Sequence, residues 1–218
     1  MLFDDITQLD ATAPLEVFAS APGFSVFTVS PDASMVTASA GLKMQADYAY
    51  DNAPPADILC VPGGQGVNPL MTDAPTLDYI RRTARNARYV TSVCTGALLL
   101  GAAGLLKGRR ATTHWASHRF LEAFGAVPVR ERVVVDGDLI TGGGVTAGVD
   151  FAFALLDAVR GRDAAALTML ALEYDPAPPF EGGSVARTKP ELVETFNRYA
   201  ETALAARAEQ VARAAAAL

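Results

Sequence analysis

The segment Tyr89–Gly101 constrains the fold of this chain more than any other part of its sequence. Tyr89–Val93 is rich in strand-forming residues, whereas Ala and Leu, which favour helix, dominate from Ala97 onward. Thr95 and Gly96 are poor choices for continuing a strand, so Cys94 is predicted at a strand-to-helix turn. Backbone N–H groups at the start of a helix lack partners, and the helix dipole places partial positive charge there. We therefore predict that Cys94 is a nucleophile with a lowered pKa, the alternative being a small buried side chain.

Two other glycine-rich turns also follow apolar segments. Asp57–Val61 is a continuous apolar run that ends in the turn Pro62–Gly66, and Leu139–Thr141 is followed by Gly142–Gly144. Strands that alternate with helices predict an α/β fold with helices on both faces of the sheet. Ligands of such folds bind at the carboxyl ends of the strands, so we expect both turns to lie near Cys94. The first turn could also supply N–H donors to an oxyanion.

Further strands are predicted from alternating or β-branched segments. Phe24–Val29 alternates as a half-buried strand does. Met35–Thr37 and Leu42–Met44 are short enough and close enough to form a hairpin. Arg132–Val135 and Leu139–Thr141 are predicted to form a second hairpin.

Helix-capping signals predict where several helices begin. Leu9–Phe18 contains Asp and Thr residues suited to capping a helix near the start of the chain, and Asp73 should cap a helix that ends at Asn86. Thr188 and Glu191 have the spacing of a capping box and should open a last amphipathic helix. Its predicted apolar stripe is Leu192, Phe196, Tyr199 and Ala203. The Ala-rich end of this helix is expected to pack or to dimerise rather than to take part in chemistry.

Composition limits the partners and the location that we expect. The 218 residues suffice for one large domain, which we place at residues 1–218. The formal net charge is −6 and no run of Lys or Arg exceeds a pair, so neither nucleic acid nor a membrane is an expected partner. No apolar run has the length of a transmembrane helix and no signal-peptide pattern is visible, so we expect a cytoplasmic protein. Cys60 and Cys94 make no disulfide framework, and a zinc site is not expected.

Three motifs together resemble the DJ-1/PfpI superfamily, and within it the isonitrile (isocyanide) hydratases. They are Thr91–Gly96, Ala111–Trp115 and Thr141–Asp150. The resemblance extends over nearly the whole chain, from Thr7–Asp10 near its start to Leu172–Phe180. It is the combination of the motifs that is specific.

The resemblance implies a fold, an assembly and a nucleophile. The fold would be a flavodoxin-like three-layer sandwich, similar to class I glutamine amidotransferases, with a mostly parallel central sheet. The protein would be a homodimer that acts on a small molecule without any metal or organic cofactor. Cys94 matches the family's nucleophile and Asp10 its acidic partner. Thr95 matches the hydratases, whereas many related peptidases have histidine at that position, which counts against a Cys–His peptidase.

Three departures from the family pattern lie near the start of the chain. The first strand of the family is several residues longer than Met1–Phe3. The Pro–Gly that follows this strand in the family is Asp4–Asp5 here, and the Gly–Pro after the acidic motif is Ala13–Pro14. The last two departures change the rigidity of the turns near Asp10.

The resemblance also implies a reaction, in which a lyase adds water to an isonitrile to give an N-substituted formamide. We expect the Cys94 thiolate to attack the terminal carbon, and Asp10 to supply a proton and later to activate water. The backbone N–H groups of Gly64 and Thr95 are expected to hold the charge that develops. The full set of expected oxyanion and substrate-binding residues is Gly63, Gly64, His114 and Trp115.

Most of these residues also have a structural interpretation. Spacing alone favours Asp10 as a helix N-cap. His114 could be a base or a histidine satisfied by the start of a helix, and the second interpretation is favoured because an acid is already present. Trp115 and the region of Phe180 could line an apolar pocket or cover the core. Cys60 lies in an apolar strand and is expected to be inert.

The main alternative function is that of a ligand- or redox-sensing domain. Motifs similar to those around Cys94 and His114 occur in the N-terminal domains of AraC-type transcription regulators, where a helix-turn-helix domain follows. No such domain is recognisable in this sequence, which disfavours a regulator. Other thiol activities of the superfamily, or a sensor that uses oxidation of Cys94, are further alternatives.

Overall fold

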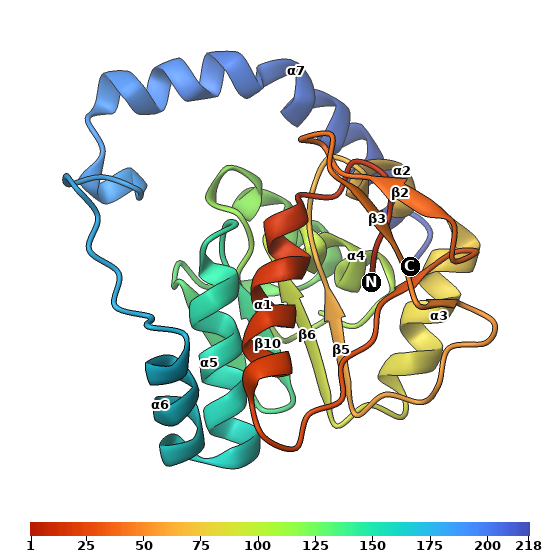
Figure 1. Ribbon diagram of the computed structural model, residues 1–218. Coiled ribbons are helices and arrows are strands. Elements are labelled where there is room, and N and C mark those ends of the chain that lie inside the picture. The colour runs from red at the N-terminus through yellow and green to blue at the C-terminus, as the bar shows by residue number, and fades with distance from the viewer.

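The computed structural model describes residues 1–218, and four strands form its central sheet in the order β5-β6-β10-β9 (Figure 1). Their bounds are Ile58–Val61 for β5, Tyr89–Val93 for β6, Leu139–Gly142 for β10 and Val133–Asp136 for β9. The pairs β5–β6 and β6–β10 are parallel, and only β9 runs antiparallel to its neighbour. Continuous apolar runs are typical of parallel strands covered on both faces. The predicted mostly parallel sheet and its hairpin are therefore confirmed.

The first residues of the chain extend this sheet beyond β5. Leu2 N–H donates to the Val29 carbonyl at 2.6 Å, and the Met1 ammonium donates to the Cys60 carbonyl at 3.1 Å. The chain start therefore lies between β5 and β1, which has the bounds Val29–Ser30 and pairs in parallel with β4 at Tyr48–Ala49. The predicted strand Phe24–Val29 is thus reduced to its last residue and the residue after it.

Helices cover both faces of the sheet and enclose one core on each. On one face lie α1 (Gln8–Ser20), α5 (Ala147–Arg160) and α6 (Arg162–Ala171). On the other lie α3 (Ala74–Ala84), α4 (Gly96–Ala102), the 3₁₀ helix η1 (Trp115–Phe124) and the end of α7 (Pro190–Ala215). Most of the buried hydrophobic residues form two separate clusters, of 12 on the first face and 31 on the second. This arrangement is the three-layer α/β sandwich expected from the sequence.

Short elements complete the fold. β2 (Met35–Thr37) and β3 (Lys43–Gln45) form the predicted antiparallel hairpin. β7 (Arg110–Ala111) pairs in parallel with β8 (Val127–Pro128), α2 is Val67–Leu70, and η2 is Val185–Arg187. Asp73 caps α3 as predicted, by accepting from the Thr76 N–H at 3.0 Å. No helix of the structure has the length and apolar character needed to span a membrane.

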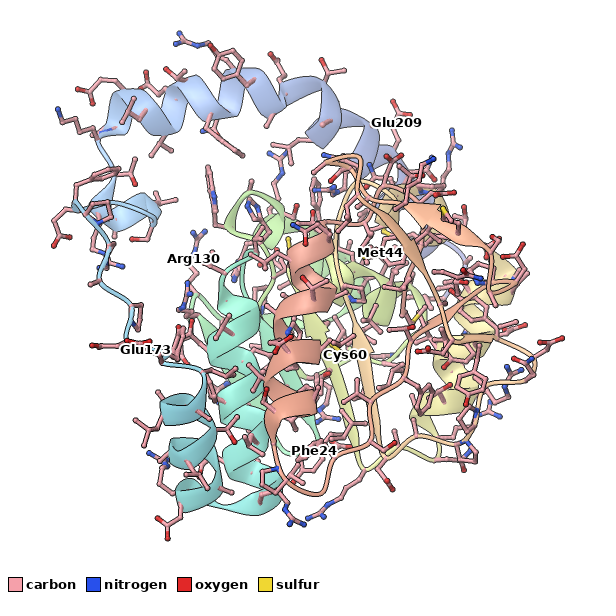
Figure 2. The ribbon with its side chains drawn as sticks, viewed as in Figure 1. Phe24, Met44, Cys60, Arg130, Glu173 and Glu209 are labelled. Atoms are coloured by element: carbon pink, nitrogen blue, oxygen red, sulfur yellow. The ribbon has the colours of Figure 1, made fainter.

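The C-terminal helix α7 extends well beyond the sandwich (Figure 1). A largely exposed connector begins after Glu173 and leads to its first turn (Figure 2). The predicted capping box is wrong, because Lys189 holds the N-cap position and no side chain caps the helix. The end of α7 is anchored by the buried residues Arg207, Val211 and Ala214, whereas Tyr199, on the predicted stripe, is 85% exposed.

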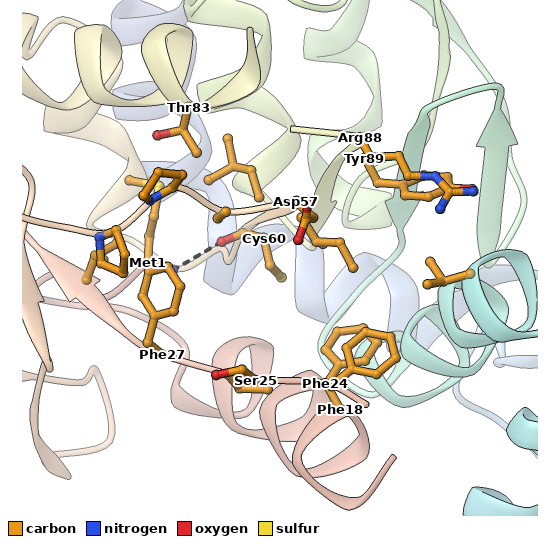
Figure 3. A pocket seen from close by; sticks show the side chains of 18 of the residues that line it. Met1, Phe18, Phe24, Ser25, Phe27, Asp57, Cys60, Thr83, Arg88 and Tyr89 are labelled. Carbon is orange, nitrogen blue, oxygen red and sulfur yellow. Dashed lines mark hydrogen bonds between the residues drawn. The ribbon is translucent and has the colours of Figure 1, made fainter. Parts of the chain in front are cut away.

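A groove of about 890 Å³ lies beside the start of β5 (Figure 3). One wall is the segment 24–27 and the other is 54–60. The Met1 ammonium points into this groove toward β5, and burial lowers its pKa. None of the residues predicted to be functional lines this groove.

Candidate active site

Cys94 lies at the turn between β6 and α4, as predicted. Its φ is +55°, in the left-handed region that residues other than glycine rarely adopt. Its N–H donates to the carbonyls of Gly142 and Gly143, at 3.1 and 2.7 Å, while Thr113 Oγ1 donates to its carbonyl at 2.7 Å. A Cβ atom at Gly96 would collide with the Val61 carbonyl, so the turn needs glycine there. A strained residue that its surroundings hold in place is typical of functional sites.

Asp10 reaches the same site from the first turn of α1, where it is completely buried. Thr7 is the N-cap of α1, so the structural interpretation of Asp10 as the cap is wrong. Its Oδ2 instead accepts from the Gly63 N–H at 3.0 Å, and its Oδ1 has no hydrogen-bond partner. A Cβ atom at Gly63 would come within 2.9 Å of this carboxylate, so glycine is what permits the approach.

The Asp10 carboxyl and the Cys94 thiol act on each other. Burial raises the pKa of Asp10 to about 6, although the bond from Gly63 and the nearby thiol lower it. Burial first, and the Asp10 charge second, raise the pKa of Cys94 to about 12. The two groups therefore titrate as a coupled pair, which holds one proton at neutral pH. The predicted low pKa of Cys94 is wrong, because burial and a neighbouring carboxylate outweigh the start of the helix.

The predicted oxyanion donors are largely occupied within the protein. Gly64 N–H donates to Thr95 Oγ1 at 2.9 Å, and this hydroxyl donates back to the Gly64 carbonyl at 3.2 Å. Gly63 N–H is taken by Asp10. The backbone N–H groups of Thr95 and Val145 instead face the Cys94 sulfur and lower its pKa. The backbone N–H of Thr95 therefore remains a candidate oxyanion donor, whereas those of Gly63 and Gly64 already donate within the protein. Val145 is a donor that the sequence did not predict.

A cavity of about 270 Å³ opens beside the thiol. It is lined by Thr7, Ser39, Gly64, Gln65, Cys94, Thr95, His114, Ala116, Val145, Phe196, Ala200, Ala203, Leu204 and Arg207. The last five belong to α7, so this helix forms the roof of the cavity. Half of the lining residues are apolar and the cavity is small, which suits a compact organic substrate.

The two predicted aromatic residues have different positions. His114 lines the cavity at the N-cap of η1, where its Nδ1 accepts from the Ala116 N–H at 3.3 Å. Burial and then the Arg207 charge lower its pKa, so the ring is neutral and its Nε2 carries the hydrogen. Trp115 does not line the cavity, since it is 37% exposed and packs against Phe196 with ring centroids 4.9 Å apart. Phe180, at 80% exposed, covers neither cavity nor core.

Arg207 is a further residue of the site that sequence reasoning missed. It is 5% exposed, and it lines the cavity. Ala203, Arg207 and Val211 are four residues apart, so the periodicity of α7 already placed this arginine on the inward stripe. No group of three or more His, Cys, Asp or Glu side chains lies close enough together to hold a metal ion.

Comparisons with known proteins agree with this fold. The DJ-1/PfpI family model matches residues 1–158. Isonitrile hydratase of Pseudomonas putida is 51% identical over 218 residues, which are 100% of this chain and 96% of that protein. The crystal structure of a THiJ/PfpI family protein from Pseudomonas syringae superimposes with a TM-score of 0.92 at 35% identity, covering 98% of this chain and 88% of that one. The HTH-type transcriptional regulator GbdR of Pseudomonas aeruginosa is 32% identical over 76% of this chain, but over only 47% of its own length.

Proposed function

Because this chain belongs to the DJ-1/PfpI family, we propose that it is an enzyme that adds water to isonitriles and releases N-substituted formamides. One observation carries the proposal: the buried carboxyl of Asp10 lies next to the buried thiol of Cys94, which opens onto a small cavity. The relative from P. putida, identical at 51% of positions along the whole chain, is named for this activity. The proposed addition of water needs neither a metal nor a redox cofactor, because nucleophilic attack and proton transfers complete it.

The first half of the reaction uses the shared proton. As the terminal carbon of the isonitrile approaches, the Cys94 proton moves to Asp10 and sulfur attacks the carbon. The N–H groups of Thr95 and Val145 stabilise the thiolate during this transfer. Asp10 then gives its proton to the carbon that has gained the electron pair. The product is a thioimidate on Cys94, beside an ionised Asp10.

The second half uses water, and Asp10 acts as a base. It takes one proton from the water that attacks the thioimidate carbon, and this proton is delivered to the nitrogen. The tetrahedral intermediate then expels the Cys94 sulfur, and the remaining hydroxyl proton returns to the pair. One water has been added in total, and the pair again holds one proton.

The cavity indicates how the remainder of the substrate binds. Phe196, Ala200, Ala203 and Leu204 form an apolar wall on α7, which suits an alkyl or cycloalkyl group on the isonitrile nitrogen. The neutral His114 ring presents Nε2–H as a donor rather than a base. Its place in the proposed mechanism is therefore to position the substrate.

We propose further that the enzyme is a cytoplasmic homodimer. Both cysteines are free thiols, which is usual in a reducing compartment. The dimer is supported by large apolar side chains that the isolated chain leaves exposed, among them Leu170 on α6 and Leu192 and Tyr199 on α7.

Product analysis tests the proposed reaction. The purified protein is incubated with cyclohexyl isonitrile, and the formamide proton is followed by NMR. We expect formamide from the unaltered protein and from Cys60→Ala, the matched control for the other free thiol, but none from Cys94→Ala. Formamide from Cys94→Ala would refute the covalent route, and none from the unaltered protein would refute the proposed substrate.

A further inference from the structure

Arg207 is a buried cation without a buried anion bonded to it. Its Nε donates to Asn68 Oδ1 at 2.9 Å, its Nη1 to Ser117 Oγ at 2.9 Å, and its Nη2 to Gln65 Oε1 at 3.1 Å. All three acceptors are neutral, and no carboxylate forms a salt bridge with this guanidinium. Uncompensated buried charge is costly, so a fold retains it only where something else balances it.

A group that can balance it, Cys94, lies at the same cavity. Arg207 is the only Lys or Arg that lines the cavity, and the titratable groups that line it with Arg207 are Cys94 and His114. Asp10 does not line the cavity but adjoins Cys94. His114 is neutral, whereas Cys94 and Asp10 together carry one negative charge. A negative Cys94 favours the charged form of Arg207 and opposes the effect of burial, which lowers the pKa of the guanidinium.

The geometry points to Arg207 as a positioning residue of the active site, whose charge balances the Cys94–Asp10 pair while its hydrogen bonds hold α7 over the cavity. This inference rests on the proposed roles of Cys94 and Asp10. The three neutral acceptors come from the segment after β5, from α2 and from η1, so they fix the guanidinium in place and leave its charge intact. Beside a buried thiol, a fixed positive charge favours the thiolate as it forms.

Alkylation of Cys94 separates the charge of Arg207 from its role in packing. Rates are measured with neutral iodoacetamide and anionic iodoacetate across pH, in a Cys60→Ala background so that one thiol reacts. Arg207→Gln removes the charge, Arg207→Lys keeps it, and Ser117→Ala removes one hydrogen bond only. We expect Arg207→Gln to lower the iodoacetate-to-iodoacetamide rate ratio about tenfold and to move the pH profile of alkylation to higher pH. Arg207→Lys and Ser117→Ala should leave the ratio unchanged.

An unchanged ratio and pH profile in folded Arg207→Gln would overturn the inference, as would an equal loss in Ser117→Ala. If Arg207→Gln does not fold, as judged by circular dichroism, the unaltered protein is compared with free cysteine. The inference then requires Cys94 to favour iodoacetate relative to iodoacetamide more strongly than free cysteine does, and a weaker preference refutes it. Alkylation needs no isonitrile, so failure of the proposed hydration would be visible separately, as absence of formamide.

Discussion

Asp10 is a carboxyl group that the folded chain buries at a cost. One of its oxygens accepts from Gly63 and the other has no partner, so the ionised form is poorly solvated. A site that needs a carboxyl with a raised pKa loses stability, because the burial that raises the pKa also destabilises the folded state when the carboxyl is ionised. At the scale of single residues, the chemistry and the stability of this protein therefore oppose each other.

Asp10→Asn should stabilise the protein while abolishing turnover. The folded pKa is raised from 3.8 to about 6, so the aspartate's stability contribution is fully present below the lower value and is lost as pH rises through the higher one. Asn has no charge to bury and can still accept from Gly63. We expect the variant's advantage in free energy of unfolding to grow between these two values to at most about 3 kcal/mol. Urea denaturation against pH measures it, and an advantage that does not vary with pH would contradict the argument.

The pH dependence of turnover should show the same carboxyl. Asp10 must be ionised to take the Cys94 proton, so kcat/KM for an isonitrile should fall tenfold per pH unit below about pH 6. The high pKa of Cys94 predicts no second decline near pH 8 or 9, about where an ordinary thiol titrates. A rate that stays constant down to about pH 4.5 would remove Asp10 from the proton transfers.

Thr95 should matter through its hydroxyl rather than through its size. Thr95→Val keeps the shape but leaves the buried N–H and carbonyl of Gly64 without their partner, at about 1–3 kcal/mol for each group. The neighbouring Gly63 holds Asp10, so turnover should fall at least about tenfold as well. Thr95→Ser retains the hydroxyl and is the matched control. Equal stability and turnover in the two variants would show that the hydroxyl is unimportant.

Sequence reasoning identified the position of Cys94 but not its ionisation. The turn is encoded locally, since a β-branched strand followed by Gly and Ala-Leu helix formers is readable within a dozen residues. The high thiol pKa depends on burial and on Asp10, which is 84 positions away in the sequence. Only the family resemblance indicated that Asp10 would lie beside Cys94. Arg207 was missed because an Ala-rich helix gives no indication of what its one inward cation faces.

At the scale of elements, burial on both faces determined which strands were predictable. The segments that became β5, β6 and β10 consist mostly of apolar and β-branched residues and are largely buried, as is typical of parallel strands covered on both faces. Phe24–Val29 has the alternating pattern of a half-buried strand, yet only Val29 pairs with another strand. A strand forms only where a neighbouring strand supplies hydrogen bonds. The segment 24–27 borders the groove beside β5 instead. The capping box at Thr188 failed for a related reason, since α7 begins away from the sandwich, where no packing fixes its first turn.

Adding residues before Met1 should stabilise the protein. The groove of about 890 Å³ has room for an added strand between 24–27 and β5, and the extension replaces the buried ammonium with a peptide N–H. We expect an extension of about four β-forming residues to raise the free energy of unfolding by about 1–3 kcal/mol. A Gly-Ser extension of equal length is the control for charge removal alone.

The pH dependence of this stabilisation separates its two causes. Burial lowers the ammonium pKa below its ordinary 8.0, so the unextended chain should gain stability as pH rises toward 8. The difference in free energy of unfolding between the extended and the unextended chain should therefore narrow over this range. The part of the gain that persists above about pH 9 reports on strand packing, because the amine is then neutral in both states. An extension that lowers stability at every pH would show that the groove does not accept a strand.

At the scale of the whole molecule, the arm formed by the outer face of α6, the connector and the first half of α7 is largely exposed in a single chain. Its exposed apolar side chains include Leu170 at 76%, Phe180 at 80% and Tyr199 at 85%. The roof residues Phe196 and Ala200 belong to the same arm. The aromatic rings that Phe196 contacts within the chain are those of His114 and Trp115. A second copy that covers the arm would both bury this apolar surface and steady the roof of the cavity.

This arrangement predicts that assembly and substrate binding are linked. Light scattering after size exclusion should give the unaltered protein twice the mass of one chain, and Leu170→Glu with Tyr199→Glu should give monomers, because a buried carboxylate opposes association. Leu42→Glu, at an exposed residue of the β2–β3 turn, is the control that should stay dimeric. The monomeric variant should keep Cys94 reactive toward iodoacetamide but bind isonitriles with a KM raised about tenfold, since only the roof is loosened. A fully active monomer would show instead that Arg207 and the end of α7 are sufficient to keep the cavity closed.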